Sequence, residues 1–88
     1  MSIKFIWIFH GTGGRFASAV FDNKENAEIW VKEKKLEGVL TKYPVNLSVY
    51  DWAIKNDLFK PKKAEHVEPK FIQKFTSASQ EHYHFEND

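Results

Sequence analysis

The sequence predicts an α+β fold: a small antiparallel sheet, with a β-hairpin at its start and a C-terminal strand, covered on one face by two to three helices. At the start, aromatic Phe5, Trp7 and Phe9 alternate with aliphatic Ile6 and Ile8, so both faces of this run are apolar, as in a strand inside a sheet. At the end, residues 81–86 alternate with the period of two that a strand requires. Between them lie stretches with helical spacing. At 88 residues, the chain is expected to form one domain over residues 1–88.

The opening strand leads into a glycine-rich turn. Residues 11–15 read Gly-Thr-Gly-Gly-Arg, and a second short apolar run follows at residues 16–21. Two apolar runs joined by such a turn predict a β-hairpin.

A helix is expected after the hairpin. Asp22 with Glu25 fits a capping box, whereas Asn23 could cap the helix instead. Gly38 is expected to supply the left-handed residue that ends the helix. Helical spacing places three apolar residues toward the sheet: Ala27, Trp30 and Val31.

The middle of the chain predicts a strand and then a second helix. Residues 39–43 form a short strand candidate that Pro44 closes, because proline cannot donate to a sheet ladder. Asn46 or Ser48 then opens a helix that extends to about residue 56. A strand over residues 47–52 is the competing interpretation.

The last third of the chain predicts an exposed connector, a helix and a strand. Residues 60–69 are polar, lysine-rich and flanked by prolines, which is typical of the least ordered internal segment. Pro69 suits the first turn of a third helix. In the closing strand, Tyr83 and Phe85 are expected to join the core, while the opposite side carries His82, His84 and Glu86.

Composition narrows the classes of function. A formal charge of +1, from 13 basic and 12 acidic residues, argues against a general polyanion binder. The absence of cysteine excludes disulfides and thiolate metal sites. No apolar run has the length of a membrane span, and the first residues lack the cleavage site of a secretory signal. We therefore expect a cytoplasmic domain without a membrane partner or a cofactor.

The glycine-rich turn is the first candidate site. Its glycines, Gly11 and Gly13 among them, would let backbone N–H groups converge on an anion, and Arg15 could clamp a phosphate or carboxylate. The P-loop and dinucleotide-binding patterns are both missing. The alternative is a plain hairpin turn that needs positive φ, with Arg15 paired to a carboxylate such as Glu86.

The histidines form the second candidate site. His82 and His84 project from the same face of the closing strand, and His10 ends the opening strand. These three could bind a metal ion with Glu81 or Glu86, or act as acids and bases. The alternative is a polar, exposed sheet face.

Five lysines form the third candidate site, which could track a nucleic-acid backbone: Lys60, Lys62, Lys63, Lys70 and Lys74. Acidic residues interrupt the set, and no aromatic platform is interleaved with it. A solvated linker is therefore the preferred interpretation, and a nucleic-acid partner is not expected.

Three motifs together resemble a small bacterial domain family of unknown function. They read FHGxGxRF at residues 9–16, VYDWAI at residues 49–54 and FTSASQEHYHFE at residues 75–86. The resemblance implies no catalytic residues, but it implies that the first and last motifs belong to one design. We accordingly expect the closing strand to pair beside the opening one, which would bring His10 and Arg15 to His82 and His84.

Two functions follow from these expectations. The first is a non-enzymatic protein-binding module, such as an immunity or antitoxin-type protein that blocks a toxin or binds a host protein. Its partner-binding residues would include Trp52, Asp51 and Asp57. The second is a small ligand-binding or metal-binding domain, which could also be enzymatic, built on His10, Arg15, His82 and His84. Convergence of those side chains in one pocket would favour the second function.

Overall fold

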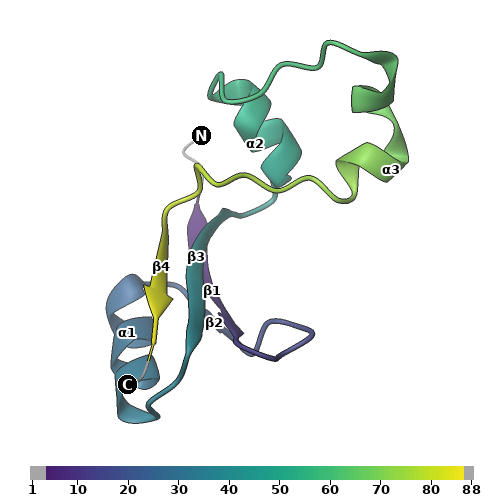
Figure 1. The fold of residues 1–88 in the computed structure, drawn as a ribbon. Helices are drawn as coiled ribbons and strands as arrows, with labels where there is room; N and C mark the ends of the chain where they lie inside the picture. Colours follow the sequence, from purple (N-terminus) through teal and green to yellow (C-terminus); the bar gives the residue numbers. More distant parts are fainter. Residues whose placement is uncertain (1–3, 87–88) are drawn as a thin grey trace. The chain divides into compact units, whose positions relative to one another are not determined.

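Four antiparallel strands form one sheet in the computed structural model, which describes residues 4–86 (Figure 1). Their order is β2-β1-β3-β4, and their bounds are Phe5–Gly11 for β1, Ala19–Phe21 for β2, Gly38–Pro44 for β3 and His82–Phe85 for β4. The predicted α+β class is confirmed. The prediction that the closing strand pairs beside the opening one is wrong, because β2 and β3 occupy both edges of β1 and β4 pairs with β3.

The chain divides into two compact units. The sheet unit comprises the described residues 4–45 and 80–86, and the helical unit comprises residues 46–79, inserted between β3 and β4. The sheet unit contains one helix, α1 (Lys24–Glu33). The helical unit contains α2 (Val49–Lys55), the 3-10 helix η1 (Ala64–Val67) and the short helix α3 (Pro69–Ile72).

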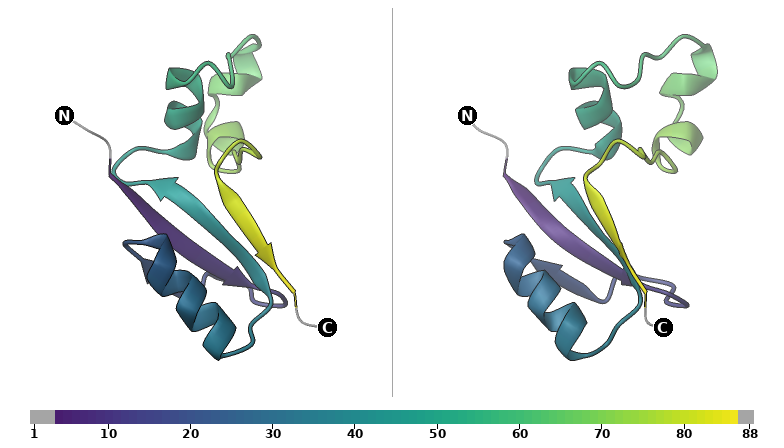
Figure 2. Two further views of the ribbon diagram at one scale, coloured as in Figure 1. Left: turned by 90° about the vertical axis from the view of Figure 1, so that its left-hand side faces the viewer. Right: turned by 60° about the vertical axis from the view of Figure 1, so that its left-hand side comes forward.

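Helix α1 covers one face of the sheet (Figure 2), and the core of the sheet unit lies between the two. The buried residues come from both layers: Trp7, Phe9, Ala27, Val31 and Leu40. Trp30 packs edge-on against Phe9 with ring centres 5.6 Å apart. Tyr83 and Phe85 pack against this core, and the Tyr83 ring lies 6.0 Å from that of Trp7. The predictions that α1 and β4 direct these apolar side chains into the core are confirmed.

Lys24 fastens α1 to the closing strand. Its Nζ lies 3.8 Å from the centre of the Tyr83 ring and 3.7 Å from a carboxylate oxygen of Glu28. The side-chain hydrogen bond with Tyr83, more than the nearby Glu28 carboxylate, raises the pKa of Lys24 above its ordinary value. Lys24 is therefore a cation throughout the neutral range.

The ends of α1 resolve one alternative and correct one prediction. Asn23 is the cap, since its side chain accepts a hydrogen bond from the Asn26 N–H at 2.9 Å. At the other end, Lys35 takes the left-handed conformation with φ 55°. The Leu36 N–H then donates to the Val31 carbonyl, which completes a Schellman motif. The prediction that Gly38 ends the helix is wrong, because the chain turns back three residues earlier to pack Leu36 on the core.

Gly38 instead allows a close approach at the start of β3, where it faces Gly11 across the sheet. A Cβ at position 38 would meet the His10 carbonyl oxygen and would lie 2.7 Å from the Phe9 ring and 2.8 Å from the Gly11 Cα. Only glycine fits this position.

The second strand of the hairpin is shorter than predicted. Residues 16–21 were expected in the strand, but β2 begins at Ala19. The turn at residues 11–14 leads the chain away from β1, and pairing resumes where the Ser18 N–H donates to the Phe9 carbonyl at 2.9 Å. Residues 12–18 are therefore a loop.

In the helical unit, α2 confirms the helical interpretation of residues 49–55 against the strand alternative. Ser48 is its cap and accepts a hydrogen bond from the Asp51 N–H at 3.0 Å. Its end repeats the motif of α1: Asp57 is left-handed with φ 58°, and the Leu58 N–H donates to the Ala53 carbonyl. The third helix begins at Pro69 as predicted but ends at Ile72.

Five rings pack together inside the helical unit: Tyr50, Phe59, His66, Phe71 and Phe75. The Tyr50 hydroxyl donates to the His66 carbonyl at 2.8 Å. The His66 Nδ1 accepts from the N–H groups of Lys62 and Lys63 at 3.0 and 3.3 Å. The lysine-rich segment, predicted as a plain connector, is thus tied to this aromatic cluster.

Candidate functional site

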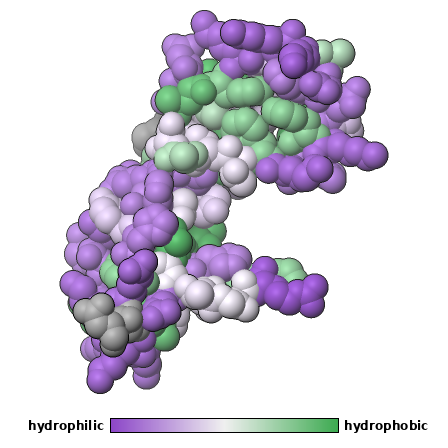
Figure 3. Space-filling model, viewed as in Figure 1, coloured by the Kyte–Doolittle hydropathy of each residue, from purple (hydrophilic) through white to green (hydrophobic). Residues whose placement is uncertain are grey.

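The loop of residues 12–18 projects from the sheet unit at the lower right of Figures 1 and 3. It presents Arg15 and Phe16 to solvent, and Phe16 is 79% exposed. The sequence predicts Phe16 as a strand residue, but the structure places it where no core can cover it. We call residues 12–18 the anchor loop.

Hydrogen bonds within the anchor loop fix its turn. The Gly14 N–H donates to the Gly11 carbonyl at 3.0 Å, and Gly13 between them has φ 84°. The His10 Nε2 lies 2.7 Å from the Gly14 carbonyl. Because a carbonyl only accepts, Nε2 must carry the proton in this bond. His10, Gly11 and Gly13 therefore act together to shape the turn.

The base of the anchor loop is also fixed. At the start of the loop, the Thr12 N–H donates to the Glu37 carbonyl at 2.9 Å. At its end, the Ser18 N–H donates to the Phe9 carbonyl, also at 2.9 Å. Two of the N–H groups that the sequence assigns to an anion cradle, those of Thr12 and Gly14, are thus already engaged. The alternative pairing of Arg15 with Glu86 is not formed either: among residues 4–86, neither side chain lies within 4.0 Å of an opposite charge.

The histidines share one sheet face but do not converge. In the register, Val39 lies between His10 and His84, and Thr41 lies opposite His82. Two strand spacings separate His10 from His84, which amounts to about 10 Å. His82 and His84 do contact each other, with ring centres 5.3 Å apart. The described part of the chain contains no group of three or more residues placed to hold a metal ion.

The structure therefore divides the predicted ligand residues into two places. His10, Gly11, Gly13 and Arg15 belong to the anchor loop or its base, whereas His82 and His84 lie on the edge strand. Glu86 is exposed beyond that strand.

The residues predicted to bind a partner lie in or beside α2. Asp51 and Asp57 are exposed and Trp52 is half-buried. Both carboxylate residues also shape the helix: Asp51 accepts a hydrogen bond from the Ser48 hydroxyl, and Asp57 occupies the left-handed position after the helix. Their role toward a partner stays a prediction.

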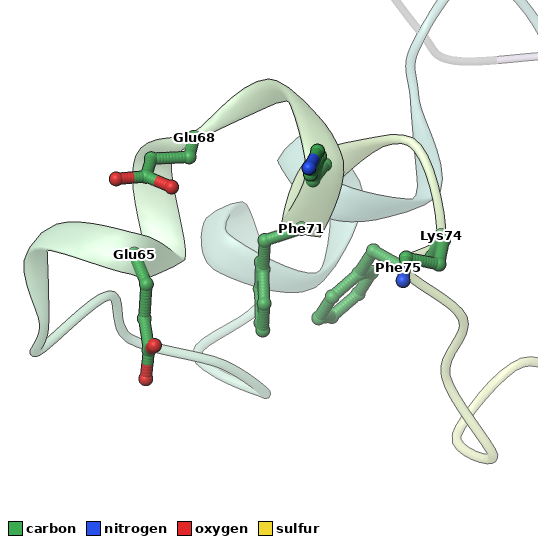
Figure 4. Close-up of a pocket in the computed structure, with 6 residues that line it drawn as sticks. Glu65, Glu68, Phe71, Lys74 and Phe75 are labelled. Atoms are coloured by element: carbon green, nitrogen blue, oxygen red, sulfur yellow. The ribbon is translucent and has the colours of Figure 1, made fainter.

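An open pocket of about 340 Å³ lies in the helical unit (Figure 4). Its lining combines two rings with four charged side chains: Glu65, Glu68, Lys70, Phe71, Lys74 and Phe75. In Figure 4 the glutamates lie to one side of Phe71 and Lys74 lies to the other. The sequence did not predict this pocket, because Glu65 and Glu68 fall in the segment that it predicts as an exposed connector. The pairing of Phe71 with Phe75 at helical spacing was the available signal.

Three further findings bear on the class of protein. Within residues 4–86, no helix combines the length and the apolar character that a membrane crossing requires. A family model described as a domain of unknown function (DUF7710) matches residues 6–88. No curated protein and no solved structure matches the chain.

Proposed function

Because the chain belongs to this family of domains of unknown function, we propose a function from the site itself: a non-enzymatic protein-binding module that holds its partner through the anchor loop. The exposure of Phe16 carries the proposal. A phenylalanine that is 79% exposed contributes little to the core. The same ring, buried by a partner, would stabilise a complex.

The neighbouring side chain suits the same role. Arginine and aromatic residues are over-represented among the few interface positions that dominate binding energy. Arg15 lies directly beside Phe16 in the chain, and its charge has no counter-ion within 4.0 Å among residues 4–86. The Arg15 guanidinium is therefore available to donate two parallel hydrogen bonds to a carboxylate of a partner.

The fixed turn favours binding as well. A loop that is already ordered loses less conformational entropy when it binds than a flexible one does. The bonds of Gly14 to Gly11 and of His10 to Gly14 hold the segment that precedes Arg15. In this proposal, Gly11 and Gly13 shape the anchor loop and do not bind a phosphate.

More specifically, we propose that the protein is a bacterial, cytoplasmic immunity or antitoxin-type protein that inserts the anchor loop into a toxin. Trp52, Asp51 and Asp57 would make a second contact with that toxin. An exposed loop that carries an aromatic ring suits an active-site cleft. The net charge of +1 provides little long-range attraction. Association should therefore proceed without steering, at about 10⁵–10⁶ M⁻¹ s⁻¹.

Partner capture tests the proposal. The tagged protein, expressed in the organism that encodes it, should retain one stoichiometric partner. Phe16→Ala and Arg15→Ala should each lower its recovery at least tenfold, because each removes a central contact of about 1.4 kcal/mol or more.

Ile29→Ala is the matched control, since Ile29 is a 55% exposed apolar residue on α1. It should retain the partner, and all three variants should melt within a few degrees of the wild type. Equal recovery with Phe16→Ala and wild type would show that the anchor loop does not bind the partner.

A further inference from the structure

We propose that His82 and His84 bind one divalent transition-metal ion of the zinc class on the edge strand β4. The site is separate from the anchor loop and does not depend on the proposed function. The two side chains are exposed and lie two residues apart on one face of the strand.

The spacing of the two rings fits a shared ion. Two imidazoles bound to one tetrahedral Zn²⁺ have ring centres about 5 Å apart, because each Zn–N bond is about 2.0–2.1 Å and each centre lies roughly 1.2 Å behind its nitrogen. The observed separation of the His82 and His84 ring centres is 5.3 Å. The separation of the two ring centres is therefore compatible with a shared ion.

The hydrogen bond of His82 prepares it as a ligand. Its Nδ1 lies 2.7 Å from the Gln80 carbonyl, so Nδ1 carries the proton and Nε2 keeps the free lone pair. Metal-binding histidines characteristically donate their second ring N–H to a carbonyl or carboxylate in this way.

The group that orients His82 is itself held in place. Gln80 is the buried polar residue of the described chain, at 6% exposure, and its side-chain amide donates to the Lys42 carbonyl at 3.2 Å. The tautomer and direction of the His82 ring are therefore set by the folded sheet before any ion arrives.

The ligand set defines the class of ion. Imidazole nitrogen suits zinc, copper and nickel, whereas magnesium and calcium require oxygen ligands. Within residues 4–86 no third protein ligand joins the pair. The remaining coordination positions are therefore left to water or to ligands outside residues 4–86.

Zinc titration of the full chain tests the proposal, with the imidazole proton signals followed by NMR. The His82 and His84 signals should shift together and saturate at one equivalent of Zn²⁺, while those of His10 and His66 should not. Mg²⁺ at the same concentration should leave every signal unchanged.

Variants give the decisive comparison. His82→Ala and His84→Ala should each weaken zinc binding at least tenfold, and the rise in melting temperature that zinc produces should disappear. His10→Ala, on the same face but two strand spacings away, should bind zinc within twofold of wild type. Unchanged affinity in the His82→Ala/His84→Ala double variant would overturn the proposal.

The two proposals fail separately. A Phe16→Ala variant should bind zinc like the wild type, because the anchor loop holds no ligand of this site. If zinc binds but no partner is captured, only the proposal for the anchor loop fails. If a partner is captured but zinc does not bind, only the proposal for His82 and His84 fails.

Discussion

At the scale of single residues, two facing glycines show how differently the same residue type can be used. Gly11 and Gly38 are opposite each other in β1 and β3. A Cβ on Gly11 would have ordinary contacts, 3.6 Å from the Phe9 ring and 3.7 Å from the Glu37 carbonyl oxygen. A Cβ on Gly38 would overlap the backbone of β1. Position 11 therefore has room for a larger side chain, whereas position 38 does not.

We predict that Gly38→Ala lowers the free energy of unfolding by about 1–3 kcal/mol, since backbone atoms would have to move to make room. Gly11→Ala should change it by less than about 0.5 kcal/mol. Urea unfolding of both variants checks the prediction. Equal stability of the two would mean that β1 and β3 do not approach as closely at this point as the structure shows.

The helix ends show what residue-level patterns could not predict. The choice between Asp22 and Asn23 as cap stayed open because both residue types cap helices well. The stop at Lys35 was missed because a left-handed residue is expected to be glycine, and Gly38 stood three positions further along. The packing of Leu36 on the core determines where α1 ends, and no local sequence pattern predicts that contact.

At the scale of elements, His66 connects the lysine-rich segment to the rings of the helical unit. Its ring lies 4.9 Å from that of Phe71 and 5.4 Å from that of Phe59. Its Nδ1 accepts the N–H groups of Lys62 and Lys63. Ring packing and hydrogen bonding can be separated by substitution.

We predict that His66→Phe keeps the ring contacts but frees the N–H groups of Lys62 and Lys63. Each intramolecular hydrogen bond contributes about 0.5–1.5 kcal/mol net, so these two amides should exchange with solvent several-fold faster. Amide hydrogen exchange measured by NMR checks this.

His66→Asn is the complementary variant, because it offers an acceptor without an aromatic ring. It should disturb the ring signals of Phe59 and Phe71 more than His66→Phe does. Protection of Lys62 and Lys63 that is identical in His66→Phe and wild type would contradict the role given to Nδ1.

The elements themselves were largely predictable from periodicity. Alternation predicted β1 and β4, the short run that Pro44 closes predicted β3, and the spacing of Ala27, Trp30 and Val31 predicted α1. The short β2 was overestimated, because Phe16 is apolar and pattern alone places apolar residues in strands. An exposed phenylalanine breaks that rule, and such breaks are expected where a protein is shaped for binding rather than for folding.

At the scale of the whole molecule, the sheet joins both ends of the chain, with β4 completing the edge beside β3. Strand order depends on contacts between residues far apart in the sequence, so periodicity could predict the strands but not their neighbours. This is why one shared site was expected, whereas the structure separates the candidate residues into two places: Arg15 and Phe16 on the anchor loop, and His82 with His84 on the edge strand. The latter pair was predictable, since alternation alone puts both on one face.

Site-specific photo-crosslinking tests whether the anchor loop is the partner-binding surface. A photoreactive phenylalanine analogue placed at position 16 keeps an aromatic ring there, and the same analogue at position 29 controls for exposure alone. Irradiation in the organism that encodes the protein should give one discrete covalent adduct from position 16 and none of that mass from position 29. No adduct from position 16, or the same adduct from both positions, would contradict the account.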